Sequence, residues 1–272
     1  MPVVDSLSQG LRFSISIKKV IPYLIIYLIT LYALIDFFGN ILRFVIGGIN
    51  IMSLLFSLGI YIPVFIIIAL VSLWIDGAMI DQAKYYNKRR SLIKSFEYST
   101  SRYISLFCAT VIYGILMGIV SSQPYIGQLL ALIFSLIFFY IYPALIVDGI
   151  GCIKSFRQSW NVFRNYPLET FVTWLLIMIL SAIIIGIFAL PVIFYLIGIL
   201  IEPLQTMEMA FVNETVTRTM IRTEILPRMA SFIRSVYFIP YFFIFCIGLA
   251  VQKVFSVGTQ ARLYINLKKR EI

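Results

Sequence analysis

Residues 170–200 read TFVTWLLIMILSAIIIGIFALPVIFYLIGIL and contain no charged side chain. A helix needs about 20 consecutive apolar residues to cross the hydrocarbon core of a bilayer, so this stretch is long enough for one crossing. Strands of a membrane barrel alternate apolar and polar residues, whereas this run is apolar throughout. We therefore expect a membrane-spanning helix. Because the run exceeds one straight crossing, it either tilts or ends near Pro191 and continues along the interface.

Five further runs have the same character, and they are Val20–Phe38, Ile51–Ile75, Tyr103–Val120, Tyr125–Val147 and Ser235–Phe255. The chain is 61% hydrophobic and only 12% charged, whereas soluble domains carry roughly 25% charged residues. A water-soluble fold could not hide this much apolar surface. The sequence predicts an all-α polytopic integral membrane protein, in which one domain (1–272) has six transmembrane helices arranged as three parallel helix pairs.

The lysines and arginines orient these helices, because short cytoplasmic loops are rich in both residues. If the N-terminus is cytoplasmic, the opposite side carries only Arg43, Arg218, Arg222, Arg228 and Arg234 of the chain's 22 basic residues. We expect a multi-pass protein of the cell membrane with both termini cytoplasmic. The net charge of +10 then indicates contact with the lipid bilayer rather than with nucleic acid.

The predicted outer loop, residues 202–234, is longer than the other loops. Its apolar residues recur at helical spacing, which favours an amphipathic helix on the outer surface. Asn213-Glu214-Thr215 is also a glycosylation sequon in a host that modifies such sites.

Three basic amphipathic segments each precede a pair of apolar runs, which suggests repeats over 5–75, 88–147 and 150–257. Ile93-Lys94-Ser95-Phe96 and Ile153-Lys154-Ser155-Phe156 are identical, and Arg12–Pro22 aligns with Arg157–Pro167 without a gap. We expect each segment to form an elbow helix in the cytoplasmic interface, with a proline in the first turn of the next span. The candidate contacts to lipid headgroups are Arg12, Lys18, Lys19, Lys94, Lys154, Arg157 and Arg164.

A second motif recurs at the ends of two spans. The second run ends Asp76-Gly77 and the fourth ends Asp148-Gly149, while the elbows contribute Ser99, Ser159 and Trp160. A glycine just past a helix end provides a C-cap turn. The aspartates are expected to be solvated turn residues or to pair with elbow cations.

The stretch Asp148–Trp160, with its acid-glycine pair and basic Ser-Trp helix, resembles the membrane domain attached to some glycerophosphodiester phosphodiesterases and related six-span proteins. The segment Thr259–Ile265 is similar to the end of that domain. The resemblance implies a membrane module with elbow helices. It does not imply hydrolase activity, because the hydrolase of that family is a separate domain that uses histidine.

Residues for catalysis or metal binding are sparse. The chain has no histidine, and its three cysteines form no CxxC pair, so we expect no enzyme activity, cofactor or metal. Asp76 and Asp81 lie five residues apart and share a helix face poorly. Asp36 is either an intramembrane carboxylate or an interfacial residue paired with water or Arg43.

Gly114 and Gly118 form a GxxxG motif in the third span, which would let another helix approach closely. We expect packing within the chain, or else a dimer face. The predicted partners are therefore the bilayer and a second membrane protein or another copy of this chain.

Three functions fit these features. The first is a non-enzymatic membrane module that acts as a scaffold or accessory for lipid handling, transport or envelope assembly. The second is a transporter or permease subunit for a neutral or lipidic substrate, since an elbow before six spans is also similar to ABC transporter domains. The third is a membrane enzyme acting on lipid headgroups through Asp76 and Asp148. A polar cavity between the helix pairs would favour the second function.

Overall fold

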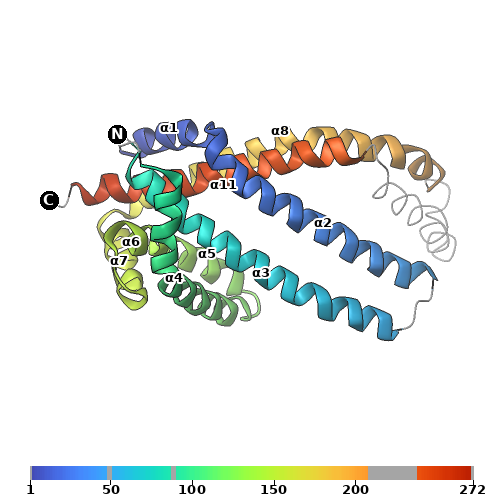
Figure 1. Ribbon diagram of the computed structural model, residues 1–272, viewed down its shortest axis with the longest axis horizontal. Helices are drawn as coiled ribbons and strands as arrows, with labels where there is room; N and C mark the ends of the chain where they lie inside the picture. Colours follow the sequence, from blue (N-terminus) through green and yellow to red (C-terminus); the bar gives the residue numbers. More distant parts are fainter. Residues whose placement is uncertain (1, 48–50, 87–89, 208–237, 271–272) are drawn as a thin grey trace. The chain divides into compact units, whose positions relative to one another are not determined.

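The computed structural model describes residues 2–47, 51–86, 90–207 and 238–270. Every element in these ranges is an α-helix (Figure 1). The helices are α1 (Pro2–Ser14), α2 (Ile17–Gly47), α3 (Ile51–Lys84), α4 (Leu92–Ser121), α5 (Gly127–Ile137), α6 (Ile141–Asp148), α7 (Cys152–Asn165), α8 (Pro167–Met207) and α11 (Phe238–Lys268).

Six stretches of the described helices are long and apolar enough to cross a membrane. They are Ile17–Ile41, Gly59–Lys84, Leu92–Ser121, Gly127–Asp148, Pro167–Gly198 and Phe238–Lys268. These stretches overlap all six apolar runs of the sequence. The prediction of an all-α polytopic membrane protein is confirmed. The predicted outer-surface helix and the sequon at Asn213 fall largely or wholly outside the described residues.

The chain forms two compact units. Unit 1 comprises Met1–Tyr23, Ala69–Ile183 and Ala250–Ile272, and unit 2 comprises Leu24–Ile68 and Ile184–Leu249. In unit 2 the hydroxyl of Tyr61 donates a hydrogen bond to Asp36 and accepts one from Asn40 at 3.3 Å. Asp36 therefore has a tyrosine partner.

The core of unit 1 lies where α6, α7 and α11 meet. Its fully buried side chains are Tyr140, Ala144, Val162, Leu263, Tyr264 and Leu267. The two ends of the described chain also meet in this unit, because Asn266 of α11 donates a hydrogen bond to Ser6 of α1 at 3.0 Å. Figure 1 shows both termini beside these helices.

Helix α3 continues nine residues past Ile75, the predicted end of the second span, to Lys84. Ala78, Met79, Ile80 and Ala83 are almost completely buried, so packing sustains the helix there. Asp76 and Gly77 consequently lie inside α3, and the predicted C-cap at Gly77 is wrong.

The predicted C-cap at Gly149 is confirmed, because Gly149 ends α6 with φ of 65°. This is the left-handed region that glycine adopts at low cost. The structure differs from the expectations for two prolines. Helix α8 runs through Pro191 to Met207, so it does not end near that proline. Pro167 opens α8 as expected, whereas Pro22 lies inside α2.

The fourth span is broken into α5 and α6, although its run is apolar throughout. Pro143 has no N–H to donate, and in a continuous helix its ring would clash with the carbonyl of Phe139, four residues earlier. The side-chain amide of Gln260 donates a hydrogen bond to this carbonyl. Ser159 donates to the carbonyl of Ile137 at 2.8 Å and accepts the N–H of Tyr140 at 3.1 Å. Side chains thus satisfy the backbone that the break leaves open, as a membrane requires.

Replacement of Ser159 by alanine should therefore destabilise unit 1. The Tyr140 N–H is buried and the Ile137 carbonyl is partly buried, and leaving a buried polar group unpaired costs about 1–3 kcal/mol. We expect a lower midpoint of thermal unfolding in detergent. Ser101→Ala is the control, because Ser101 is exposed and bonds only the carbonyl of Tyr98 in its own helix. Equal losses in the two variants would contradict this account of the break.

The three amphipathic segments, residues 2–14, 92–101 and 152–165, differ in how they join the next span. The first and third are separate helices, α1 and α7, whereas the second is the uninterrupted start of α4. Pro167 disfavours helical geometry at Tyr166 and so separates α7 from α8. No proline stands at the corresponding place in α4. The prediction of three separate elbow helices is therefore wrong for the second segment.

All three segments nevertheless bury small side chains at four-residue spacing. Residues 91–100 and 151–160 have the same order of buried and exposed positions, with serines buried at 95, 99, 155 and 159. The first segment buries Ser6, Gly10 and Ser14 in the same manner. Small residues let two helices approach closely.

The buried faces pack in a cyclic order along the chain. Ser99 donates a hydrogen bond to the carbonyl of Trp74 in α3 at 2.7 Å. Ser159 bonds the carbonyl of Ile137 in α5, and Gly10 lies against Thr259 of α11. Each segment therefore contacts the second span of the preceding helix pair, and the first segment contacts the last span. The three segments therefore share one kind of contact, and the repeats over 5–75, 88–147 and 150–257 stay a prediction.

Candidate functional site

A carboxylate and an ammonium group form an ion pair within unit 1. Asp76 of α3 accepts a hydrogen bond from the Tyr23 hydroxyl at 2.6 Å, and the Lys253 ammonium lies 3.0 Å from its other oxygen. The side chain of Asp76 is 17% exposed and that of Lys253 is 33% exposed. The pair is thus sheltered but still accessible.

Polar side chains from two other spans lie close to this pair. The hydroxyls of Tyr142 and Thr110 are 3.1 Å apart, and the charges of Asp76 and Lys253 both act on Tyr142. We call the resulting set the central cluster, and it consists of Tyr23, Asp76, Thr110, Tyr142 and Lys253. Five of the six spans contribute to it. Gln252 donates a hydrogen bond to Ser181 of α8 at 3.0 Å, which is a separate contact because successive residues of a helix point to different sides.

Asp148, the repeat counterpart of Asp76, has the same kinds of partner. The Tyr264 hydroxyl lies 2.6 Å from one carboxylate oxygen of Asp148, and the Lys268 ammonium lies 2.6 Å from the other. All these partners belong to α11. The pairing of both aspartates with cations agrees with one of the two sequence expectations, but the lysines come from the last span and not from an elbow.

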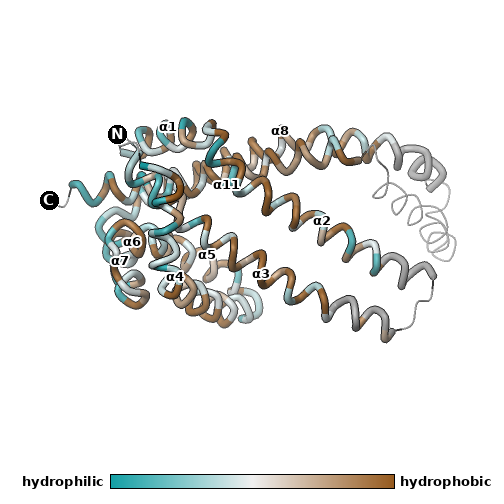
Figure 2. Tube along the Cα trace, in the orientation of Figure 1, coloured by the Kyte–Doolittle hydropathy of each residue, from teal (hydrophilic) through white to brown (hydrophobic). Residues whose placement is uncertain are grey.

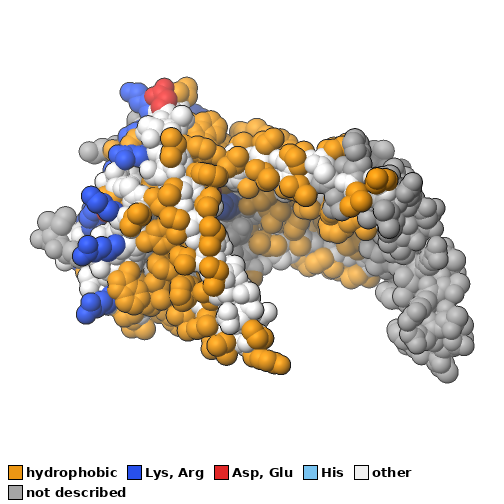
Figure 3. All heavy atoms as spheres, turned by 90° about the horizontal axis from the view of Figure 1, so that it is seen from below, with side chains coloured by type: hydrophobic (Ala, Val, Ile, Leu, Met, Phe, Trp, Pro, Cys, Tyr) orange, Lys and Arg blue, Asp and Glu red, His pale blue; other side chains and the backbone are white. Residues whose placement is uncertain are grey.

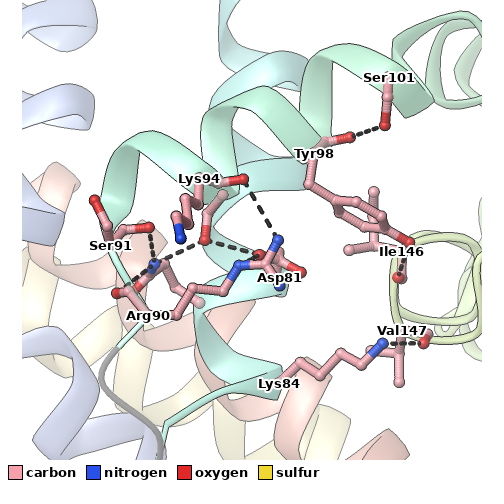
Figure 4. Close-up of polar contacts among 11 residues, drawn as sticks. Asp81, Lys84, Arg90, Ser91, Lys94, Tyr98, Ser101, Ile146 and Val147 are labelled. Carbon is pink, nitrogen blue, oxygen red and sulfur yellow. Dashed lines mark hydrogen bonds and ion pairs between the residues drawn. The ribbon is translucent and has the colours of Figure 1, made fainter.

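A third carboxylate, Asp81, holds the second amphipathic segment against α3 (Figure 4). Asp81 is 1% exposed, forms an ion pair with Arg90 at 2.9 Å and accepts a hydrogen bond from Ser95 at 2.7 Å. Gln82 also donates to Ser95, at 2.7 Å. A carboxylate with this many partners has a structural role.

The end of α6 is held by side chains from two neighbouring helices. In Figure 4, Lys84 reaches the carbonyl of Val147 at 2.7 Å, and Tyr98 donates to the carbonyl of Ile146 at 3.1 Å. The last carbonyls of a helix lack partners within it and carry partial negative charge, so a lysine is favourable there. These contacts fix the turn that contains Asp148 and Gly149.

The predicted headgroup contacts are exposed with one exception. Arg12, Lys18, Lys94, Lys154, Arg157 and Arg164 are exposed, whereas Lys19 is half-buried. Ile93 is 70% exposed beside Lys94, and Ile153 is 79% exposed beside Lys154. In Figure 2 the amphipathic segments are largely hydrophilic, and Figure 3 shows basic side chains along one edge of an apolar face of unit 1. Apolar and cationic groups side by side suit a bilayer interface.

The GxxxG motif has no helix packed on it within unit 1. Apart from the motif's own helix, no described atom of unit 1 lies within 4 Å of the position a Cβ would take at Gly114 or Gly118, so the expected packing within the chain is not found among these residues. The dimer face stays a prediction. Trp160 is 44% exposed next to the buried Ser159.

The described residues show no cluster of three or more histidine, cysteine or acidic side chains suited to a metal. Burial, reinforced by the nearby Cys108 thiol, raises the pKa of Cys152 to about 12. This thiol is therefore protonated at neutral pH, and a thiol in that state is a weak nucleophile.

Sequence reasoning marked Asp76 and Asp148 but missed their partners. A lysine near the end of an apolar run, such as Lys253, is expected to reach solvent, yet Lys253 forms an ion pair inside unit 1. Tyr23 and Tyr264 occupy no shared position in the repeats, so only the fold reveals them. Comparison with family models, curated proteins and solved structures finds no match to this chain.

Proposed function

We propose that this chain is a non-enzymatic membrane module that binds a lipid-like molecule and assists lipid handling, transport or envelope assembly. One observation carries the proposal. Five of the six spanning helices contribute a polar side chain to the central cluster, in which the Lys253–Asp76 pair remains partly exposed. Ionisable side chains within membrane spans are costly and usually serve a function.

The composition of unit 1 favours an amphipathic ligand. Its spans carry exposed aliphatic side chains, such as Ile104, Ile115 and Ile179, which suit acyl chains. The cluster offers a cation and hydroxyl groups to a polar headgroup. The exposed cations of the amphipathic segments would hold the same end of the protein at the headgroup layer of the cytoplasmic leaflet.

The second candidate is a transporter or permease subunit for a neutral or lipidic substrate. The broken fourth span favours it, because discontinuous helices often border transport sites. The gap between α5 and α6 contains Tyr140, two residues before Tyr142 of the central cluster. Uptake or flipping of a labelled lipid by reconstituted vesicles would distinguish a transporter from a binding module.

The binding proposal is tested with the double variant Asp76→Asn/Lys253→Met, which removes both charges of the central pair at once. We expect native mass spectrometry to detect a lipid on the purified protein but not on this variant. The matched control is Asp148→Asn/Lys268→Met, which removes the counterpart pair and should leave the lipid bound. If both double variants retain lipid like the parent protein, the central cluster is not a binding site.

A further inference from the structure

Two cations outside the central cluster lie together without an acidic partner among the residues that the structure describes. The Arg262 guanidinium is centred 4.5 Å from the ring centroid of Tyr86, and the Lys19 ammonium lies 5.7 Å from the same centroid. The Lys19 ammonium also lies 3.6 Å from the ring centroid of Phe13, and the charges of Lys19 and Arg262 act on each other. Like charges this close repel, so the aromatic rings offset only part of the cost.

Arg262 is the more confined of the two. It is 8% exposed, and its Nε and Nη2 atoms are buried without a hydrogen-bond partner. In the described part of the chain, the ion pairs involve other cations, namely Arg90, Lys253, Lys268 and Arg270. A buried guanidinium without a counter-charge is strongly unfavourable.

Two more buried polar atoms near this place lack partners. They are Oγ1 of Thr259, one turn before Arg262 on α11, and Oε1 of Gln9 on α1. The two helices meet here, because a Cβ at Gly10 would lie 1.9 Å from the Thr259 hydroxyl. Buried polar groups nearly always have a hydrogen-bond partner. Unpaired buried atoms of Gln9, Thr259 and Arg262 therefore indicate that a ligand binds here. Because Lys19 and Arg262 have no acidic partner among the described residues, the expected ligand is an anion.

We propose that a phosphate group binds between Lys19 and Arg262. A guanidinium offers parallel N–H donors to two oxygens of a phosphate, and a lysine ammonium adds a point charge. Lys19 lies in the first turn of α2 next to the exposed Lys18, where the span meets the predicted interface and lipid phosphates lie. The site goes beyond the proposed function, because it shares no residue with the central cluster and either site can fail alone.

The test uses the full chain in an uncharged detergent. Binding of inorganic phosphate is measured by calorimetry, and retention of phosphatidylglycerol against phosphatidylcholine is measured by native mass spectrometry. Lys19→Gln and Arg262→Gln should each raise the dissociation constant at least about tenfold, as expected for losing one charge-assisted contact. Lys269→Gln removes an exposed cation just past the end of α11 and should leave binding unchanged. Arg262→Met keeps the site testable if Arg262→Gln does not fold.

The two probes identify the source of the phosphate. Loss of phosphatidylglycerol alone in the variants would assign a lipid headgroup, loss of inorganic phosphate alone would assign a soluble anion, and loss of both would show that any phosphate group is accepted. The proposal is overturned if the parent protein binds neither probe, or if the Lys19 and Arg262 variants bind as tightly as the parent. Without phosphate, Arg262→Met should unfold at the same or a higher temperature than the parent, because it removes a buried unpaired charge.

Discussion

Replacing Gly77 by leucine should strongly destabilise this protein. A Cβ at this position would lie 2.4 Å from the hydroxyl oxygen of Ser99 and 2.7 Å from a methyl carbon of Leu106. Both neighbours are buried in α4, so neither can move aside without shifting that helix. Overpacking of this kind typically costs 1–3 kcal/mol and occasionally more, and we expect about 3 kcal/mol or more here.

The substitution also endangers a hydrogen bond. Ser99 donates to the carbonyl of Trp74, three residues before Gly77 on the same face of α3, and a leucine would push the two helices apart at that point. Thermal unfolding in detergent measures the effect, and Gly114→Leu is the control because nothing lies within 4 Å of its Cβ position. Similar unfolding midpoints for the two variants would show that α3 and α4 are not in close contact.

Removal of the Asp76 carboxylate should be nearly as damaging. Asp76→Ala leaves the Lys253 ammonium without the counter-charge 3.0 Å away and the Tyr23 hydroxyl without its acceptor. Breaking a fully buried ion pair costs 3–5 kcal/mol. Lys253 is 33% exposed, so solvent screening reduces the expected loss to about 2 kcal/mol.

The reverse substitution distinguishes a charge effect from a packing effect. Adding Lys253→Met to Asp76→Ala removes the cation that has lost the Asp76 counter-charge, and we expect the double variant to recover part of the lost stability. A double-mutant cycle measured by thermal unfolding gives the coupling energy between the two residues. If the two losses simply add, Asp76 and Lys253 do not form an ion pair in the folded protein.

The six spans could be predicted from sequence because the length of an apolar run decides whether a helix can cross a bilayer. The break in the fourth span could not. It depends on Gln260 and Ser159, which come from elsewhere in the chain and satisfy the carbonyls left open. The extension of α3 past Ile75 likewise depends on tertiary burial of Ala78 and Met79, which no local pattern specifies.

Only part of the central cluster could be predicted from the sequence. The repeated Asp-Gly pair identified Asp76 and Asp148, because a repeated motif can be recognised without any knowledge of the fold. Their partners on α2 and α11 follow no repeat spacing and lie far away in the chain. The unpaired Arg262 gave no sequence signal, since a basic residue near the end of a span is expected to reach solvent.

Labelling of single cysteines in intact cells tests the central claim, an even number of crossings with both chain ends on one side. In a cysteine-free background, Arg12→Cys, Arg164→Cys and Lys269→Cys would be compared with Ser122→Cys, which lies between α4 and α5. An impermeant maleimide added outside should label position 122 alone, and positions 12, 164 and 269 only after the membrane is opened. Labelling of positions 12 and 269 from opposite sides would contradict the six-span arrangement.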